Sequence, residues 1–328
     1  MALYVNTNVS SINAQRKLAN STLALNTSYQ RLSSGLRINS SKDDAAGLQI
    51  SDRLTSQING LNQGNRNAND GIALAQTIEG ALDEQTNMLQ RIRTLAVQAA
   101  NGTNTAKDRQ ALQEEVTSLS HEITRIAKKT TFAGAQVLDG AGDNTLTRKV
   151  AIAGAANTFK AQYFFQVGAN SMDEITMDTR GFKISNALSA MSASKWDVGN
   201  NAKVGTDFCK IGMITKFGGQ ADFSNARFSV STASMAQATL ANIDKFIEYV
   251  DSNRAELGAI QNRMESTIRN QSSIAENESD ARSRIRDTDF ASETAALTQN
   301  QIIQQASQTI LSQANQRPTV ALNLLGGR

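Results

Sequence analysis

Residues 54–96 have the sequence LTSQINGLNQGNRNANDGIALAQTIEGALDEQTNMLQRIRTLA. An apolar side chain recurs in this stretch at every seventh position, at Leu54, Leu61, Ala68, Ala75, Leu82, Leu89 and Ala96. A sustained interval of seven places these side chains on one stripe of an α-helix, which is the pattern of a coiled-coil seam. The stripe predicts one helix over about residues 43–100, roughly 87 Å long at 1.5 Å per residue.

The long helix is expected to end at Asn101-Gly102, a pair that favours a turn. Beyond it, apolar residues alternate at intervals of four and three, at Leu112, Val116, Leu119, Ile123 and Ile126. This pattern predicts another helix, which we expect to fold back along the long one. The chain has a single proline, Pro318, so almost nothing in it forces a helix to stop.

Glycines interrupt the long predicted helix at Gly60, Gly64, Gly71 and Gly80. Each costs about 1 kcal/mol relative to alanine inside a helix, so a compensating reason is expected. The close approach of another backbone is such a reason, and a subunit interface would provide it.

The two ends of the chain carry matching helical patterns. Near the N-terminus, intervals of four and three link Leu18, Thr22, Leu25, Tyr29, Leu32 and Leu36. Toward the C-terminus, the pattern returns at Leu240, Ile243, Ile247, Val250, Leu257, Met264 and Ile268, and again at Ala296, Ile303 and Ile310. A short helix cannot bury such a stripe alone. We therefore expect a mainly α fold, in which the N- and C-terminal segments pair as coiled-coil termini of a long antiparallel helical rod, and self-assembly.

The middle of the chain follows other patterns. The alternating run at residues 163–167, followed by turn signals at 168–170, predicts a β-hairpin. Residues 186–232 contain Trp196 and Cys209 but show no sustained period. We expect this segment to be a small α+β or β-rich unit that projects outward from the paired helices.

Composition excludes several functional classes. A formal net charge of +3 without clustered Lys and Arg argues against nucleic acid as a partner. A lone Cys209 permits no internal disulfide and no multi-cysteine metal site. Residues 1–8 lack the features of a Sec signal peptide, and no apolar run is long enough to span a membrane. We expect no cofactor, no membrane insertion and no enzymatic activity.

Several motifs closely resemble those of bacterial flagellins, in particular polar flagellins. The most specific are residues 31–40 (RLSSGLRINS) and 42–47 (KDDAAG), and others include 56–61 (SQINGL), 66–71 (RNANDG), 257–263 (LGAIQNR), 281–285 (ARSRI) and 313–316 (QANQ). The resemblance implies a secreted, extracellular subunit of the flagellar filament. It also implies an inner-tube domain at 1–42 plus 286–328, an outer-tube domain at 43–185 plus 233–285, and a variable outer segment at 186–232.

The resemblance further implies partners and contact residues. Export by the flagellar type III apparatus, a dedicated export chaperone, filament cap and hook–filament junction proteins, and other flagellin copies in a homopolymeric or mixed filament are all expected. The assembly seam would include Leu18, Leu25, Leu32, Leu36, Ile303, Ile310, Leu324 and Leu325. Gln90, Arg91, Leu95 and Glu115 resemble the patch bound by the host Toll-like receptor that senses flagellin.

Other interpretations carry less weight. The run His121-Glu122-Ile123-Thr124-Arg125 resembles half of a zinc-protease motif, but Arg125 stands where the second histidine ligand would have to lie. Ser192, Ser194 and Thr206 are candidates for O-linked sugars. A hook–filament junction protein and a secreted helical effector or adhesin remain alternative functions for a chain of this pattern.

Overall fold

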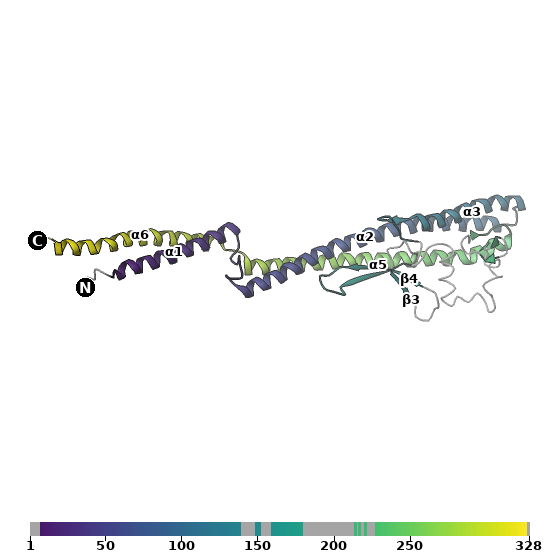
Figure 1. Ribbon diagram of the computed structural model, residues 1–328. Helices are drawn as coiled ribbons and strands as arrows, with labels where there is room; N and C mark the ends of the chain where they lie inside the picture. The colour runs from purple at the N-terminus through teal and green to yellow at the C-terminus, as the bar shows by residue number, and fades with distance from the viewer. Residues whose placement is uncertain are drawn as a thin grey trace. The chain divides into compact units, whose positions relative to one another are not determined.

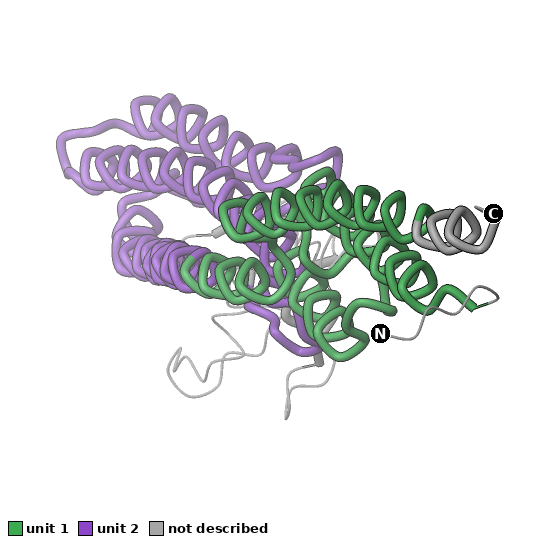
Figure 2. Tube along the Cα trace, turned by 90° about the vertical axis from the view of Figure 1, so that its left-hand side faces the viewer, with its two compact units in different colours: residues 1–59, 273–328 green, residues 60–272 purple. Residues whose placement is uncertain are grey.

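The computed structural model describes residues 7–138, 148–151, 159–179, 213–214, 216–217, 220–221 and 227–326. The chain divides into two compact units, which Figure 2 colours separately. Unit 1 comprises Met1–Asn59 and Ser273–Arg328, and unit 2 comprises Gly60–Ser272. Among the described residues, no helix is both long enough and apolar enough to cross a membrane.

Long helices make up most of the described chain (Figure 1): α1 Val9–Ser34, α2 Ala45–Ala100, α3 Ala106–Lys129, α5 Ala233–Arg286 and α6 Phe290–Gly326. The prediction of a mainly α fold is confirmed. The predicted long helix over 43–100 is also confirmed, because α2 runs from Ala45 to Ala100 and is followed by the turn at Asn101 and Gly102. Helix α3 starts with a capping box formed by Thr105 and Asp108.

The strands are short and antiparallel. One sheet has the order β3-β4-β5, built from β3 Arg148–Ala151, β4 Phe159–Gln166 and β5 Glu174–Thr179. The two-residue strands pair as β1 Thr131–Phe132 with β2 Ala135–Gln136, β6 Met213–Ile214 with β9 Arg227–Phe228, and β7 Lys216–Phe217 with β8 Gln220–Ala221. The predicted hairpin is confirmed, since Phe165 pairs with Ile175 and Gln166 with Glu174 across the turn. Trp196 and Cys209 lie outside the described residues.

Unit 2 is organised around an apolar core between α2, α3, α5 and the β4–β5 hairpin. The predicted stripe on α2 lies in it from Ala68 to Ala96, with Ala68, Ala75, Leu82 and Ala96 fully buried and Leu89 nearly so. Helix α3 contributes Val116 and Ile123, and α5 contributes a continuous heptad pattern: Ala236, Thr239, Ile243, Phe246, Val250, Asn253, Leu257, Ile260 and Met264. The core confirms that α3 folds back along α2, and Gln85 Nε2 donates to the Ile123 carbonyl oxygen at 3.3 Å.

The glycines of α2 allow the hairpin to approach the helix closely. A Cβ added to Gly64 would collide with the Val167 carbonyl oxygen, and one on Gly60 would lie 2.6 Å from the Ala169 Cβ. A Cβ on Gly71 would lie 2.8 Å from the Met264 Cε, whereas one on Gly80 would meet nothing within 4 Å. The expected close approach of another backbone is therefore correct for Gly60 and Gly64, whereas Gly71 meets the side chains of Met264 and Phe165. The neighbour belongs to the same chain, however, and no subunit interface is needed to explain them.

Unit 1 contains the pairing of α1 with α6, which lie side by side in Figure 1. The residues of α1 that face α6 are spaced three and four apart: Ser11, Ala14, Leu18, Ser21, Leu25, Ser28 and Leu32. The predicted stripe was therefore wrong at Leu36, which lies beyond the end of α1. Tyr29 lies at the edge of the interface: it is 52% exposed, but its hydroxyl accepts a hydrogen bond from Gln301 Nε2 of α6 at 3.1 Å. Three serines, Ser11, Ser21 and Ser28, occupy the buried face, although a serine carries no hydrophobic signal in a sequence pattern.

Candidate functional site: the terminal helix pair

The interface between α1 and α6 is more polar than the core of unit 2. Its α6 side consists of Glu293, Leu297, Asn300, Gln304, Ser307, Leu311 and Ala314. Ser21 Oγ donates to the Asn300 carbonyl oxygen at 2.9 Å, and Ser11 Oγ donates to Asn315 Oδ1 at 2.8 Å. Small side chains bring the two helices close enough for these bonds. The hydrogen bonds fix the register of the pair, because each needs one particular partner on the opposite helix.

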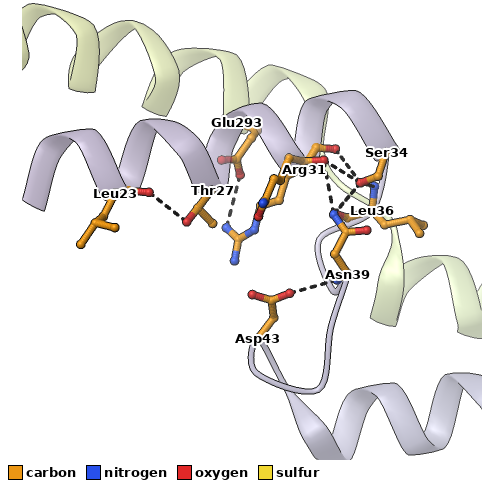
Figure 3. Close-up of polar contacts among 9 residues, drawn as sticks. Leu23, Thr27, Arg31, Ser34, Leu36, Asn39, Asp43 and Glu293 are labelled. Atoms are coloured by element: carbon orange, nitrogen blue, oxygen red, sulfur yellow. Dashed lines mark hydrogen bonds and ion pairs between the residues drawn. The ribbon is translucent and has the colours of Figure 1, made fainter.

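Charge and turn geometry define the end of the pair at the start of α6 (Figure 3). The Arg31 guanidinium lies 3.5 Å from the Glu293 carboxylate, and both side chains are partly buried. Gly35 ends α1 in the left-handed region at φ 72°, where its N–H donates to the Arg31 carbonyl oxygen at 2.8 Å. Glycine adopts that conformation without the steric cost that a Cβ imposes. This turn directs the chain out of α1.

The segments that follow α1 and precede α6 bind each other. Leu36 forms an antiparallel bridge with Asp287, Arg37 N donates to the Arg286 carbonyl oxygen at 2.7 Å, and Thr288 N donates to the Gly35 carbonyl oxygen at 3.0 Å. Leu36, which the sequence placed on a helix stripe, therefore lies in this bridge and not on α1. These backbone bonds hold residues 35–38 and 286–288 together within unit 1.

Asp43 organises the loop before α2. Its Oδ2 accepts hydrogen bonds from Ser40 N at 2.9 Å and Asn39 N at 3.1 Å, as Figure 3 shows for Asn39. Hydrogen bonds from the Ser40 and Asn39 backbones hold the pKa of the Asp43 carboxyl below its ordinary value of 3.8. The loop is thus fastened by an ionised carboxylate.

The other faces of the terminal pair expose large apolar side chains. Besides Tyr29 and Phe290, these are the aliphatic residues Val9, Ile12 and Leu23 on α1 and Ile302, Ile303 and Ile310 on α6. We call these six residues the outer stripe. In Figure 3 the Leu23 side chain points away from α6. The predicted seam through Ile303 and Ile310 therefore does not face α1: the two side chains are 40% and 55% exposed. Leu324 and Leu325 belong to the last turns of α6, and their side chains are outside the described ones.

Of the predicted receptor contacts, three lie at the surface and one does not. Gln90 and Arg91 are exposed on α2, and Arg91 Nη2 lies 2.7 Å from Glu115 Oε1 on α3. Leu95 is 1% exposed and belongs to the core of unit 2. Leu95 lies on the same buried face of α2 as Ile92 and Ala99, which are three and four residues away. In this structure the Leu95 side chain is not available to a receptor.

Residues considered for other chemistry carry no site in the described part of the chain. His121 is exposed, and its neighbour Glu122 pairs with Arg125 at 2.6 Å, a hydrogen bond that lowers the pKa of the Glu122 carboxyl. Among the described residues, no three His, Cys, Asp or Glu side chains gather as metal ligands would. Ser192, Ser194 and Thr206 lie outside the described residues.

Comparison with known proteins decides the family. The family model for the bacterial flagellin N-terminal helical region matches residues 5–143, and that for the C-terminal helical region matches residues 240–325. The chain is 41% identical to Flagellin D of Vibrio anguillarum, in an alignment that covers 99% of this chain and all of that protein. This chain belongs to the bacterial flagellins.

Two further proteins are similar to this chain. Polar flagellin B/D of Vibrio parahaemolyticus is 40% identical, again over 99% of this chain and all of that protein. The crystal structure of Bacillus cereus flagellin is 24% identical with a TM-score of 0.42, covering 63% of this chain and 88% of that one. The two family models and the full-length relatives identify this flagellin as a structural subunit that self-assembles into the extracellular flagellar filament, and it is not an enzyme.

Proposed function

We propose that the outer stripe on α1 and α6 is the surface through which one subunit binds the next in the filament. The observation that carries this proposal is that Ile302, Ile303 and Ile310 are exposed on a helix whose opposite face is already occupied by α1. Water-exposed isoleucine favours burial by about 25 cal/mol per Å² of apolar surface. In a polymer-forming subunit, neighbouring copies supply that burial.

Charge placed on the stripe tests this proposal. The double variant Ile303→Asp with Ile310→Asp should remain monomeric, because each carboxylate would have to be buried in the interface without a partner. The matched control is Gln305→Asp with Ser312→Asp, which adds the same charge to exposed polar positions of α6. Sedimentation and electron microscopy of seeded samples give the result. Filaments from the stripe variant, or loss of filaments in both variants, would contradict an interface through this stripe.

We further propose that residues 1–42 with 286–328 form an inner-tube domain that both termini must complete. Support comes from the α1–α6 pairing, in which each helix covers the other's small-residue face. Removal of residues 1–35, or of 294–328, should leave a soluble monomer whose unit 2 is still helical by circular dichroism. Filaments grown from either truncated chain would rule the proposal out.

An export chaperone is expected to bind α6 before the flagellin leaves the cell through the flagellar type III apparatus. The outer stripe on α6, with Leu324-Leu325 at its end, is the apolar surface that a chaperone would have to cover to prevent premature polymerisation. Calorimetric titration of the cognate chaperone should give binding to the full chain and none to a chain that lacks residues 289–328. Equal binding to both would place the chaperone site elsewhere.

Filament cap and hook–filament junction proteins are expected to meet the same terminal helices at the two ends of the filament. The outer stripe supports this proposal, because part of it has no flagellin neighbour in a subunit at the end of the filament. Pull-down with the Ile303→Asp, Ile310→Asp variant should lose both proteins, whereas the Gln305→Asp, Ser312→Asp control should retain them. Retention by the stripe variant would separate these partners from the assembly surface.

We propose that the host Toll-like receptor binds the monomer at Gln90, Arg91 and Glu115. Support comes from the motif and from the exposure of the Arg91–Glu115 pair on adjoining helices. The variant Arg91→Asp should strongly reduce signalling in receptor-reporter cells, since interface arginines are common hot spots. The exposed Arg125–Glu122 pair on α3 provides the control, as Arg125→Asp. Full signalling from the Arg91 variant would refute this patch. Leu95→Ala is unsuitable, because it would open a cavity in the core.

O-linked glycosylation of Ser192, Ser194 or Thr206 stays a prediction from the sequence. Intact-mass analysis of subunits from native filaments, followed by their fragmentation, would detect hexose-sized additions in the peptide that contains these residues. A subunit mass equal to the mass calculated from the amino-acid sequence would exclude these sugars.

A further inference from the structure

The chain contains two Asn-Gly pairs, Asn59-Gly60 and Asn101-Gly102. Such a pair can lose ammonia without an enzyme when the backbone nitrogen of the glycine attacks the side-chain amide carbon of the asparagine. Glycine favours the attack because it has no Cβ to obstruct it and because its backbone is conformationally free. The local structure decides whether the two atoms can meet, so a single chain offers a direct comparison.

Asn59-Gly60 is held in a conformation that prevents the attack. Both residues are interior to α2, so the Gly60 N–H takes part in the regular i to i−4 hydrogen bonds of the helix. Gly60 is also packed against Ala169 of the hairpin, as a Cβ on Gly60 would lie 2.6 Å from the Ala169 Cβ. The pair can react only when α2 opens locally.

Asn101-Gly102 has neither restraint. It follows the last residue of α2, and both residues are exposed. Within the part of the chain that the structure describes, the Gly102 N–H has no hydrogen bond, and a Cβ on Gly102 would meet nothing within 4 Å. The Asn101 side chain has one weak contact, in which Thr103 N donates to its Oδ1 at 3.5 Å.

We propose that Asn101 is a site of spontaneous deamidation in this flagellin and that Asn59 is not. The Gly102 nitrogen bonds to the Asn101 side-chain carbonyl carbon, the C–N bond of the amide breaks, and ammonia leaves with the proton from the Gly102 nitrogen. Water then opens the cyclic imide at either carbonyl, which gives aspartate or isoaspartate. The net change is one water consumed and one ammonia released, with no oxidant or enzyme.

The product alters the connection between α2 and α3. A carboxylate at position 101 lies at the C-terminal end of α2, where the helix dipole disfavours negative charge. Isoaspartate also lengthens the backbone beside the two carbonyl oxygens that Arg109 binds, Ala99 O at 2.9 Å and Asn101 O at 3.1 Å. Because a filament subunit stays outside the cell after assembly, modified Asn101 accumulates with the age of the subunit.

Peptide mapping by mass spectrometry tests the proposal on the full chain incubated in mildly alkaline buffer. Conversion of Asn101 to the acid should be faster than that of Asn59 by more than about tenfold, because Asn59 reacts only through rare helix opening. In chain unfolded in denaturant, the two rates should become similar. Equal rates in the folded chain, or an intact Asn101 after Asn59 has reacted, would overturn the proposal.

The variant Gly102→Ala provides the control, since its Cβ enters open space and the fold should persist. It should slow conversion of Asn101 by about tenfold or more through the added steric obstruction, with unchanged circular dichroism. An unchanged rate would show that backbone attack by residue 102 is not the mechanism. A sugar mass on Asn101 in native filaments would show instead that the Asn-Gly-Thr sequon is glycosylated.

Discussion

The α1–α6 pair of unit 1 and the α2–α3–α5 core of unit 2 use the same heptad spacing for opposite purposes. In unit 2 the stripe consists of large residues such as Ile78, Leu82 and Ile92, each with no exposed surface. In unit 1 the stripe between the helices includes Ser11, Ser21, Ser28 and Ser307, while large residues such as Ile302 lie outside, 61% exposed. Unit 2 therefore buries its own large apolar side chains, whereas the terminal helices of unit 1 leave theirs exposed.

This difference has an energetic reason. Burial of a Leu or Ile side chain contributes about 1.5–3 kcal/mol, whereas a serine contributes little beyond its hydrogen bond. Because the α1–α6 interface alternates serines with leucines such as Leu25, it gains specificity of register but less stability than the core of unit 2. We infer that the fold of the monomer depends on unit 2, and that α1 and α6 gain most of their stability on assembly.

The largest expected change in the free energy of unfolding comes from replacing the residues at the C-terminal boundary of the outer segment. Phe228 is 1% exposed and Val230 fully buried in the core of unit 2, and Gln113 fixes this segment by donating to the Phe228 carbonyl oxygen at 3.1 Å and accepting from Val230 N at 2.6 Å. Replacing residues 180–226 with a Gly-Ser linker should leave filament formation intact. Extending the replacement to 232 should cost at least about 3–5 kcal/mol, from Phe228 alone.

Urea unfolding of the two linker variants, followed by circular dichroism, measures that difference. The sequence predicted an outer segment of 186–232. Because residues 228–230 are buried against the helices, we expect the dispensable part to end before them. Equal stability of the two variants would mean that unit 2 does not depend on these buried residues. Failure of the shorter replacement to polymerise, although folded, would show that the outer segment makes an essential contact.

A second prediction compares one side chain from each unit. Leu82→Ala should lower the free energy of unfolding of the monomer by about 2–5 kcal/mol, because it leaves a cavity in the core. Ile310→Ala should change it by less than about 0.5 kcal/mol, since the side chain is mostly in water. In filament assembly, Ile310→Ala should have the larger effect and should raise the critical concentration for polymerisation. A large loss of monomer stability in Ile310→Ala would break the comparison between the units.

A third prediction concerns two glycines of α2 in unit 2 and has opposite signs. Gly64→Ala should destabilise the chain by about 1–3 kcal/mol, because the Cβ would meet the Val167 carbonyl oxygen and displace the hairpin. Gly80→Ala should stabilise it by up to about 1 kcal/mol, since the Cβ meets nothing within 4 Å and alanine is the better helix former. Thermal unfolding gives both values. Shifts of the same sign would contradict the close approach of the hairpin to Gly64.

The smallest effect is the dependence of stability on pH. Hydrogen bonds from the Thr105 side chain and backbone lower the pKa of the Asp108 carboxyl below its ordinary value of 3.8, as the Ser40 and Asn39 backbones do for Asp43 in unit 1. A lowered folded-state pKa gives stability that is complete above the unfolded value and is lost as pH falls through the folded value. Thermal unfolding of Asp108→Asn should therefore show a weaker acid dependence than the parent chain. An unchanged dependence would exclude a contribution from this cap.

The sequence located most helices but not all of their faces. Leu61, Ala68 and Leu89 were recognised because large or consistently apolar residues at an interval of seven define a stripe without further information. The buried face of α1 was shifted, because Ser21 and Ser28 have no hydrophobic signal of their own. The Ser21 hydroxyl donates to the Asn300 carbonyl oxygen on the opposite helix, a partner that a local pattern cannot reveal.

The same limit applies to the candidate sites. The motif around residues 90–95 identified Arg91 at the surface, but it could not reveal that Leu95 is buried, since α2 faces two other helices there. Likewise, the repeated glycines of α2 predicted the close approach of another backbone. Only the fold identified that neighbour as Val167 and Ala169, about a hundred residues later in the same chain.

By itself, the sequence determined that this flagellin forms long helices, that the longest predicted one ends before Asn101, and that its two termini pair. Helix periodicity and turn preference are local properties, so they are encoded within a few residues of where they act. The tertiary structure alone decided which stripe faces inward, which glycines have a neighbour packed against them, and which isoleucines stay exposed. These outcomes depend on what lies opposite each residue, and residues far apart in the chain supply that surface.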